Sequence, residues 1–449
     1  MDFQLFSMFV VLTSLVVMLT GFSYLQNKCH VHPEITRKSV HVGMGLVTLS
    51  FPWVFNSYIP VLLLAGIASV SLVLIRSIKF LRKNAGSALN EVERKGFGEL
   101  FFPIGVAVIF TFYDGEILLY VIPILILTFA DALAAIVGRF SGRLFFTTPD
   151  GLKTLEGSGV FVLIAFLCIF FPLTLFSDLT LINVILIAVL LSLIVTLFEA
   201  VSWSGLDNLF IPVFSFLLLK KYLVLDNSLL LIHISFMAAL LVFLIIWRKS
   251  ASLRTESILM ATLFGYFTWA IGGWPWFTIA LLALVSYPFL TPRIDDVKVK
   301  RHGIQVILHV AGTGVVWLVV SQVWQYDISY FIFVLGYATH LSIILLVRHK
   351  AARPRTGTGQ LVVQSIVKSF AVLFIPFIFF TGVEFNLIWL MLVGLLLVSL
   401  ACMNFVYVCP DLRDYKLNIK KERWILQTSL VMLYASISIV PITFLLRYA

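Results

Sequence analysis

Apolar segments of about twenty residues follow one another along nearly the whole chain, with short polar stretches between them. A helix needs about 20 mainly apolar residues to cross a bilayer, and it satisfies its own backbone hydrogen bonds there. Of the 449 residues, 61% are hydrophobic and 12% are charged, which a soluble fold would not need. The sequence therefore predicts an all-α fold, a polytopic integral membrane helical bundle in two halves, residues 1–247 and 248–449. About sixteen spans are expected, at residues 4–25, 39–55, 58–78, 99–113, 117–137, 159–176, 180–198, 209–224 (or a re-entrant segment), 228–246, 257–272, 274–290, 304–323, 328–347, 361–381, 385–407 and 425–446.

The distribution of positive charge predicts an orientation for this bundle. Cytoplasmic loops of membrane proteins collect Lys and Arg. With the N-terminus outside, 28 of the 32 Lys and Arg residues fall on the cytoplasmic side, and Arg423 is one of them. The net charge of +10 then reflects orientation, so we expect no nucleic-acid partner. The first apolar segment has no basic leader and no cleavage site, and we expect it to be a retained span.

Four polar stretches interrupt the first half, and this orientation places all of them on the cytoplasmic side. In the first, Arg37 and Lys38 begin a span and His41 follows one helical turn later. Residues three and four apart share a helix face, so this cluster suits a phosphate, or else it is a topology-setting pair with an interfacial histidine. The second stretch places Glu99 at the mouth of a span, where a carboxylate also suits the helix dipole.

The third stretch, residues 130–158, begins with a carboxylate at the end of an apolar segment. Burying an ionisable group beside hydrocarbon costs roughly 2.5–3.5 kcal/mol, so Asp131 needs a reason to be there. Mg²⁺, which prefers carboxylate oxygens and substrate phosphates, would supply that reason. The glycines Gly138 and Gly142 would let backbone amides approach a nucleotide. The sequence has no GxxxxGK[ST] motif here, which excludes a P-loop.

The same stretch carries the cations that could neutralise phosphate charge during transfer, Arg139, Arg143 and Lys153. Lys153 belongs to the sequence KTLEGS, which also contains Glu156 and Gly157 and lies at the edge of the next span. We expect Gly157 to be part of the phosphate site.

The fourth stretch contains carboxylates on the side that otherwise collects cations. Glu199 ends one span and Asp207-Asn208 precedes the next, with no Lys or Arg between them. Such uncompensated charge suggests a metal ion or a distant cationic partner. An N-cap formed by Asp207 and Asn208 is the alternative.

The order of these motifs, RK..H...G, GEL..P, ADA.A...GR..G, KTLEGS and E......LDN...P, resembles the polyprenol kinase family of phytol, farnesol and dolichol kinases over about residues 30–225. The resemblance implies an enzyme that transfers phosphate from CTP to a membrane isoprenoid alcohol, giving the prenyl monophosphate and CDP. Relatives usually have glycine at the position of Ala130 and often a second lysine beside Lys153.

The resemblance and the residue chemistry together assign roles to these side chains. The catalytic residues would be Asp131, Lys153, Glu156 and Asp207. The nucleotide and phosphates would contact Arg37, Lys38, His41, Gly138, Arg139, Gly142, Arg143 and Gly157. A divalent cofactor, Mg²⁺, would be held by Asp131, Glu199, Asp207 and Asn208, and Glu156 or Glu199 would be a further ligand or base. The expected partners are the lipid alcohol, the nucleotide and a second copy in a homodimer.

The second half resembles the membrane family that contains plant phytyl-phosphate kinase. Its acidic Asp-Thr-x-Ala-Ser-Glu motif is missing, because residues 336–345 hold no carboxylate. We therefore predict that this half is catalytically silent and serves lipid binding or dimerisation, although Asp295, Asp296, Asp411 and Asp414 keep a catalytic role open. The isolated polar residues His309, His340 and Lys368 are interpreted as hydrogen-bonding groups between helices or as snorkelling side chains.

Two other functions remain open for the whole chain. A lipid cytidylyltransferase would use the same nucleotide and membrane setting but would release pyrophosphate. A transporter or a non-catalytic prenol-binding protein would turn over no nucleotide, and carboxylates gathered at one face argue against a transport path at the midplane.

Overall fold

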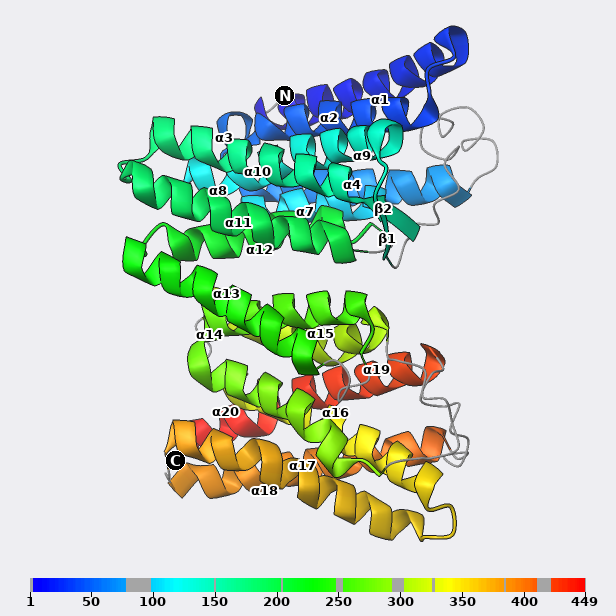
Figure 1. Ribbon diagram of the computed structural model, residues 1–449, viewed down its shortest axis with the longest axis vertical. Coiled ribbons are helices and arrows are strands. Elements are labelled where there is room, and N and C mark those ends of the chain that lie inside the picture. Colours follow the sequence, from blue (N-terminus) through cyan, green and yellow to red (C-terminus); the bar gives the residue numbers. More distant parts are fainter. Residues whose placement is uncertain are drawn as a thin grey trace. The chain divides into compact units, whose positions relative to one another are not determined.

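The computed structural model describes residues 3–77, 98–148, 151–202, 205–247, 253–292, 303–324, 328–382, 385–409 and 421–448. It divides the chain into two compact units, Met1–Ser235 and Phe236–Ala449. The division lies inside one helix, earlier in the chain than the expected boundary after residue 247. Figure 1 shows both units as bundles of helices.

The first unit contains most of the polar stretches. Its elements are α1 (Phe3–Cys29), α2 (Pro33–Leu49), α3 (Phe51–Val54), α4 (Tyr58–Ser77), α7 (Gly98–Phe112), α8 (Ile117–Leu125), the π-helix η1 (Ile126–Ala130), α9 (Asp131–Ser141), β1 (Phe145–Thr148), β2 (Gly151–Thr154), α10 (Leu155–Phe176), α11 (Leu181–Val201), α12 (Asp207–Tyr222) and the first part of α13 (Asn227–Trp247). The second unit continues with α14 (Thr255–Leu290), α15 (Ile304–Trp324), α16 (Ser329–Ala352), α17 (Thr358–Thr381), α18 (Phe385–Val408), α19 (Lys421–Ile437) and α20 (Ile439–Tyr448).

Eleven helices within the described ranges are long and apolar enough to cross a membrane, and two shorter apolar helices, Tyr58–Leu74 and Leu100–Phe112, accompany them. The prediction of a helical integral membrane protein is therefore confirmed. The count of sixteen spans stays a prediction. One helix, α14, covers the two expected spans 257–272 and 274–290, and it bends at Gly273, whose φ of 76° interrupts the helical backbone.

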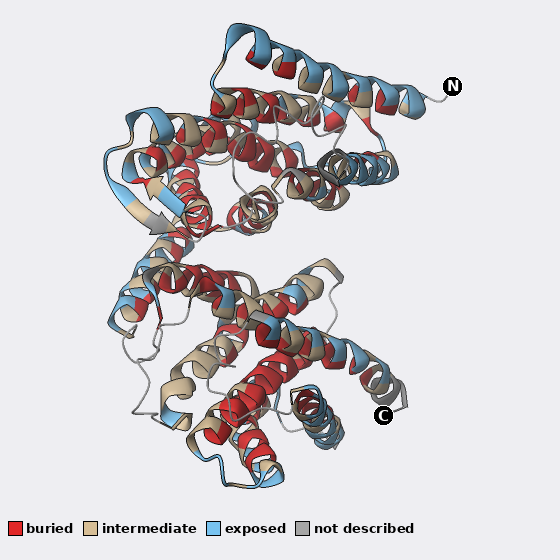
Figure 2. Cartoon of the chain, turned by 90° about the vertical axis from the view of Figure 1, so that its right-hand side faces the viewer, coloured by how far each residue is buried: buried red, intermediate tan, exposed pale blue. Residues whose placement is uncertain are grey.

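Figure 2 shows that the helices bury their inward faces and expose their outward faces. Many exposed residues are large hydrophobic ones, as a bundle in lipid requires. In the first unit, α10 packs against α9 and α11, α7 packs against α4 and α12, and α2 packs against α9. The helix ends that carry the polar stretches lie at one side of this unit, on the right in Figure 1, together with the two strands. The convergence expected from the sequence is thus present within the unit.

The span that ends in Asp131 is interrupted shortly before that residue. Pro123 lies inside α8, and the five residues Ile126–Ala130 form a π-helix, after which α9 begins at Asp131. Short π-helical turns inside α-helices leave the backbone hydrogen-bond ladder irregular and occur often at functional sites. The interruption makes the carbonyl group of Leu127 available to the side chain of His41 on α2.

The strands β1 and β2 form an antiparallel hairpin, with Phe146 paired to Lys153. The expectation of a purely helical chain is wrong at this point. The sequence of residues 148–151, Thr-Pro-Asp-Gly, is typical of a turn, and β-branched and aromatic residues precede it. Because the hairpin holds Lys153, it places that ammonium group relative to the neighbouring helices.

The core of the second unit is α16, of which almost every residue is buried. Polar side chains connect it to its neighbours: His340 contacts Thr313 Oγ1 of α15 at 3.2 Å, and Lys368 Nζ of α17 lies 3.2 Å from His349 Nε2. On α15, His309 Nδ1 lies 2.8 Å from Thr428 Oγ1 of α19. The interpretation of His309, His340 and Lys368 as hydrogen-bonding groups between helices is confirmed.

Candidate active site

A carboxylate and two basic side chains form the centre of the site. The Nζ atom of Lys38 donates to Asp131 Oδ2 at 2.6 Å, and His41 Nε2 lies 3.4 Å from the same oxygen. Lys38 and His41 are three residues apart on α2, so both face α9. Burial lowers the pKa of Lys38, and the charge of Asp131 opposes that effect. The structure thus joins the first and third polar stretches.

The π-helix fixes the histidine of this cluster. His41 Nε2 lies 2.9 Å from the carbonyl oxygen of Leu127, which accepts a hydrogen bond when Nε2 carries the proton. The His41 ring also packs edge-on against Phe102 of α7, with centroids 5.2 Å apart. His41 therefore has a defined orientation between two helices.

Gly45 allows α2 to approach the π-helix this closely. A Cβ atom at Gly45 would lie 2.0 Å from Thr128 Oγ1, which is far inside van der Waals contact. Any larger residue would push α2 away from η1 and move Lys38 and His41 from Asp131. The glycine at the end of the motif RK..H...G thus has a packing role.

Arg37 pairs with a carboxylate of its own helix. Its guanidinium donates to Glu34 at 2.7 Å. Burial acts to lower the pKa of Arg37, but the carboxylates of Glu34, Asp131 and Asp207 outweigh it and raise the pKa above its ordinary value. The influence of Asp207, at the start of α12, is the smallest of these three.

A second ion pair joins the hairpin to the end of α11. Lys153 Nζ lies 2.7 Å from Glu199 Oε1 and also donates to the backbone carbonyl of Glu199. The two side chains are mostly buried, at 18% and 14% exposure. Glu199 thus has the cationic partner that its own loop lacks, and that partner comes from the hairpin.

Asp207 and Asn208 begin α12 after the N-cap residue Leu206, and Asp207 Oδ1 accepts the N–H of Asn208 in the first turn at 3.0 Å. Asn208 Nδ2 donates to the carbonyl of Gly98 at 2.8 Å. A Cβ atom at Gly98 would lie 2.8 Å from that same nitrogen, so the glycine is needed for the contact. The other amide atom, Asn208 Oδ1, is buried and has no hydrogen-bond partner among the described residues.

The remaining residues of the third stretch shape the loop. The carboxylate of Glu156 accepts the N–H of Leu144 at 3.2 Å, which fastens the entry of the hairpin to the start of α10. Thr154 Oγ1 caps α10 by accepting the N–H of Gly157 at 3.2 Å.

The glycines of this stretch permit the close packing of α9 against that cap. A Cβ atom at Gly138 would lie 2.9 Å from Thr154 Oγ1, one at Gly142 would lie 2.4 Å from the carbonyl of Gly138, and one at Gly157 would lie 3.0 Å from the carbonyl of Ala134. Packing therefore accounts for all three glycines, and their contact with a nucleotide stays a prediction.

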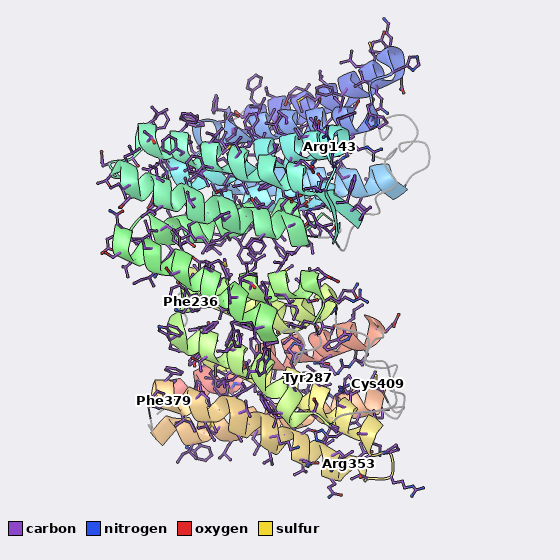
Figure 3. All side chains as sticks on the ribbon, viewed as in Figure 1. Arg143, Phe236, Tyr287, Arg353, Phe379 and Cys409 are labelled. Atoms are coloured by element: carbon purple, nitrogen blue, oxygen red, sulfur yellow. The ribbon has the colours of Figure 1, made fainter. Side chains whose placement is uncertain are left out.

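Arg139 and Arg143 are exposed, and neither forms an ion pair with any residue that the structure describes. Figure 3 labels Arg143 at the end of the first unit where the hairpin lies. Glu99 lies in the first turn of α7, and its side chain is outside the described part of the chain. Asp295, Asp296, Asp411 and Asp414 also lie outside the described residues.

The described residues do not gather three or more His, Cys, Asp or Glu side chains into one metal-binding group. The expected set of Asp131, Glu199, Asp207 and Asn208 is therefore not a closed cage, and two of its carboxylates are paired with lysines. Mg²⁺ usually takes only one or two protein carboxylates and completes its shell with water and phosphate oxygens. The Asp207 carboxylate and the unpartnered Asn208 Oδ1 fit that donor set.

Sequence reasoning missed three contributors to this site: the Leu127 carbonyl, Phe102 and the Thr154 hydroxyl. The motif K[ST].EG[ST] contains Thr154 three residues before Gly157, which is the spacing of an N-cap. No sequence signal indicates the π-helix, because its residues are as apolar as the rest of the span.

These features define a class of protein, a polytopic membrane protein whose first helical unit carries ion-paired carboxylates and basic side chains at one end. Over 201 residues the chain is 30% identical to the phytol kinase of Synechocystis sp., an alignment that covers 43% of this chain and 82% of that protein. The chain therefore belongs to the phytol kinase family. No family model matches the chain, and no solved structure matches it.

Proposed function

We propose that the first unit transfers a phosphoryl group from CTP, with Mg²⁺, to the hydroxyl group of a long-chain isoprenoid alcohol such as phytol, geranylgeraniol or dolichol, giving the prenyl monophosphate and CDP. The observation that carries this proposal is the Lys38–Asp131–His41 cluster, which places a buried carboxylate and two basic groups at the end of an apolar span. The relation to phytol kinase supports a prenol kinase activity in general. CTP as the donor follows from the family resemblance.

The two buried ion pairs give a physical account of nucleotide binding. In the structure, Lys38 and Lys153 neutralise Asp131 and Glu199. An entering triphosphate offers these lysines a more highly charged partner, so they can exchange carboxylate for phosphate oxygens. That exchange frees Asp131 and Glu199, and phosphoryl transfer depends mainly on such positioning and charge neutralisation.

The freed Asp131 would accept the proton of the prenol hydroxyl, while the exposed Arg139 and Arg143 would bind the outer part of the nucleotide. When bound, Mg²⁺ would neutralise charge on the phosphate oxygens, and Asp207 and Asn208 are the residues that would hold it.

An apolar cavity offers a place for the prenyl tail. Counted together with its open side, it contains about 510 Å³ of space that no protein atom occupies, and it is lined by α1, α2, α3, α4 and α7, including Met44, Thr48 and Phe102. Phe102 also contacts the ring of His41. A tail in this cavity would therefore leave the alcohol's hydroxyl group beside the cluster of Lys38, His41 and Asp131.

The test is a turnover assay with the purified full-length chain, a panel of isoprenoid alcohols, all four nucleoside triphosphates and Mg²⁺. We expect prenyl monophosphate and CDP in equal amounts, with CTP as the best donor. Release of pyrophosphate would instead identify a cytidylyltransferase. Tight binding of the alcohol without turnover of any nucleotide would identify a binding protein and contradict the proposal.

A further inference from the structure

A large apolar cavity inside the second unit holds a buried arginine. Counted together with its open mouth, the cavity contains about 1110 Å³ of space free of protein atoms, and helices α13, α14, α15, α16 and α19 line it. Nearly all lining residues are apolar, and the lining also includes the polar residues Thr268, Tyr287, His340 and Arg423.

Arg423 is 2% exposed, and none of its three guanidinium nitrogens has a hydrogen-bond partner among the described residues. Its Cζ atom lies 4.0 Å from the ring centroid of Trp424. A cation–π contact offsets only part of the cost of burying a guanidinium that cannot lose its proton. The sequence suggested a loop cation that sets topology, but the structure places this residue inside the bundle.

A second arginine strengthens the positive field at this end of the cavity. Arg348 of α16 stands over the ring of Tyr287, with its Cζ atom 5.9 Å from the centroid, and its Nε atom is buried without a partner in the described structure. Neither arginine forms an ion pair with a described carboxylate; Glu256, in the same unit, instead pairs with Arg254. Figure 3 labels Tyr287 on α14.

The histidine of the cavity already has hydrogen-bond partners. His340 Nδ1 accepts from Gln427 Nε2 at 2.8 Å, and His340 Nε2 contacts Thr313 Oγ1 at 3.2 Å. The histidine is therefore fixed by its neighbours, whereas the Arg423 guanidinium has no hydrogen-bond partner or counter-ion in the described parts of the chain.

We propose that this cavity binds an acidic lipid with a single long apolar tail, whose phosphate or carboxylate head pairs with Arg423 while the tail fills the apolar remainder. An anionic head satisfies the guanidinium with charge-assisted hydrogen bonds, which are strong where water is excluded. A neutral lipid would fill the same volume but leave the arginine unpaired. The inference does not depend on the proposed function, because it concerns a different unit and no chemical step.

The test measures lipid binding to the purified full-length chain by native mass spectrometry and thermal shift. The probes are geranylgeranyl monophosphate, hexadecanoate, geranylgeraniol and inorganic phosphate. The two acidic lipids should bind the wild type. Arg423→Gln should lower the affinity for both at least about tenfold, which is the effect of losing a hydrogen bond to a charged group. Weakening of one acidic lipid alone would identify the head as phosphate or as carboxylate.

The matched control is Arg254→Gln, the same substitution at an exposed arginine of the same unit, which should leave binding unchanged. Lipid held by the first unit is present in both variants and cancels in the comparison. Without lipid, Arg423→Gln should melt no lower than the wild type, because it removes a buried unpaired charge. As a second probe, Ala280→Phe narrows the cavity and should weaken the long-tailed acids without touching the charge. Equal affinity in Arg423→Gln or Ala280→Phe and the wild type, or equal binding of geranylgeraniol and the acids, would overturn the proposal.

Discussion

Replacing Asp131 with asparagine tests the ion pair at the centre of the candidate active site. The side chain of Lys38 is 4% exposed and its Nζ lies 2.6 Å from Asp131 Oδ2. The substitution keeps the size of the side chain but leaves the lysine buried without a counter-ion. Removing one partner of a buried pair costs about 3–5 kcal/mol. We expect Asp131→Asn to lower the free energy of unfolding by about that amount and to abolish turnover.

A double-mutant cycle separates the charge effect from a packing effect. Lys38→Met alone leaves Asp131 unpaired, whereas Asp131→Asn/Lys38→Met leaves no buried charge and should recover most of the lost stability. The matched control is Asp114→Asn, which breaks an exposed ion pair. Asp114 Oδ2 lies 3.5 Å from Lys220 Nζ, and the substitution should lower the free energy of unfolding by no more than about 1 kcal/mol.

The pH dependence gives a further check. Burial lowers the pKa of Lys38 in the folded chain below its ordinary value of 10.5, and loss of Asp131 removes the charge that opposes this. At pH values between the pKa of Lys38 in the folded chain and its ordinary pKa, Lys38 binds its proton more fully in the unfolded chain. The free energy of unfolding therefore rises with pH in this range. The difference in free energy of unfolding between the wild type and Asp131→Asn should therefore become smaller as the pH rises toward 10.5.

Thermal and denaturant unfolding of the purified chains in detergent, followed by tryptophan fluorescence, measures these differences. Additive effects of Asp131→Asn and Lys38→Met, or an Asp131→Asn variant as stable as the wild type at neutral pH, would refute the reasoning.

Three further predictions concern the surroundings of the site. Gly45→Ala should reduce turnover strongly, because its Cβ atom would meet a side chain at 2.0 Å, whereas Gly66→Ala, with nothing within 4 Å, should leave turnover unchanged; initial rates compare the two. Glu156→Gln should weaken the bond to Leu144 and make the hairpin more sensitive to limited proteolysis, and an unchanged cleavage rate would contradict that role. Cys29 is exposed at the end of α1, so the expected orientation predicts that a membrane-impermeant maleimide labels it only from the cytoplasmic side, and labelling from outside would reverse the topology.

Much of the fold follows from the sequence because a segment that crosses lipid must be a helix of about 20 mainly apolar residues. Most expected spans fall on single helices, whereas α14 merges two of them across Gly273 and the spans 39–55, 117–137 and 425–446 are each divided between consecutive helical segments. The convergence of the polar stretches could also be predicted, since charge places them at one end of the bundle. The ion pairs Lys38–Asp131 and Lys153–Glu199 are the contacts that realise it.

Other features depend on tertiary packing and leave little trace in the sequence. The π-helix before Asp131 has an ordinary apolar composition, so nothing indicates that Leu127 will offer its carbonyl to His41. The roles of Gly138 and Gly142 could not be separated into nucleotide contact and helix packing without coordinates. Arg423 looks like a loop cation in the sequence because only the fold shows what surrounds it.

The most direct test of the central claim is the initial rate at which the γ-phosphate of labelled CTP enters prenyl monophosphate, measured in parallel for the wild type, Asp131→Asn and Asp114→Asn. We expect labelled product with the wild type and Asp114→Asn and none above background with Asp131→Asn. Full transfer by Asp131→Asn would contradict the proposed role of Asp131 in phosphoryl transfer.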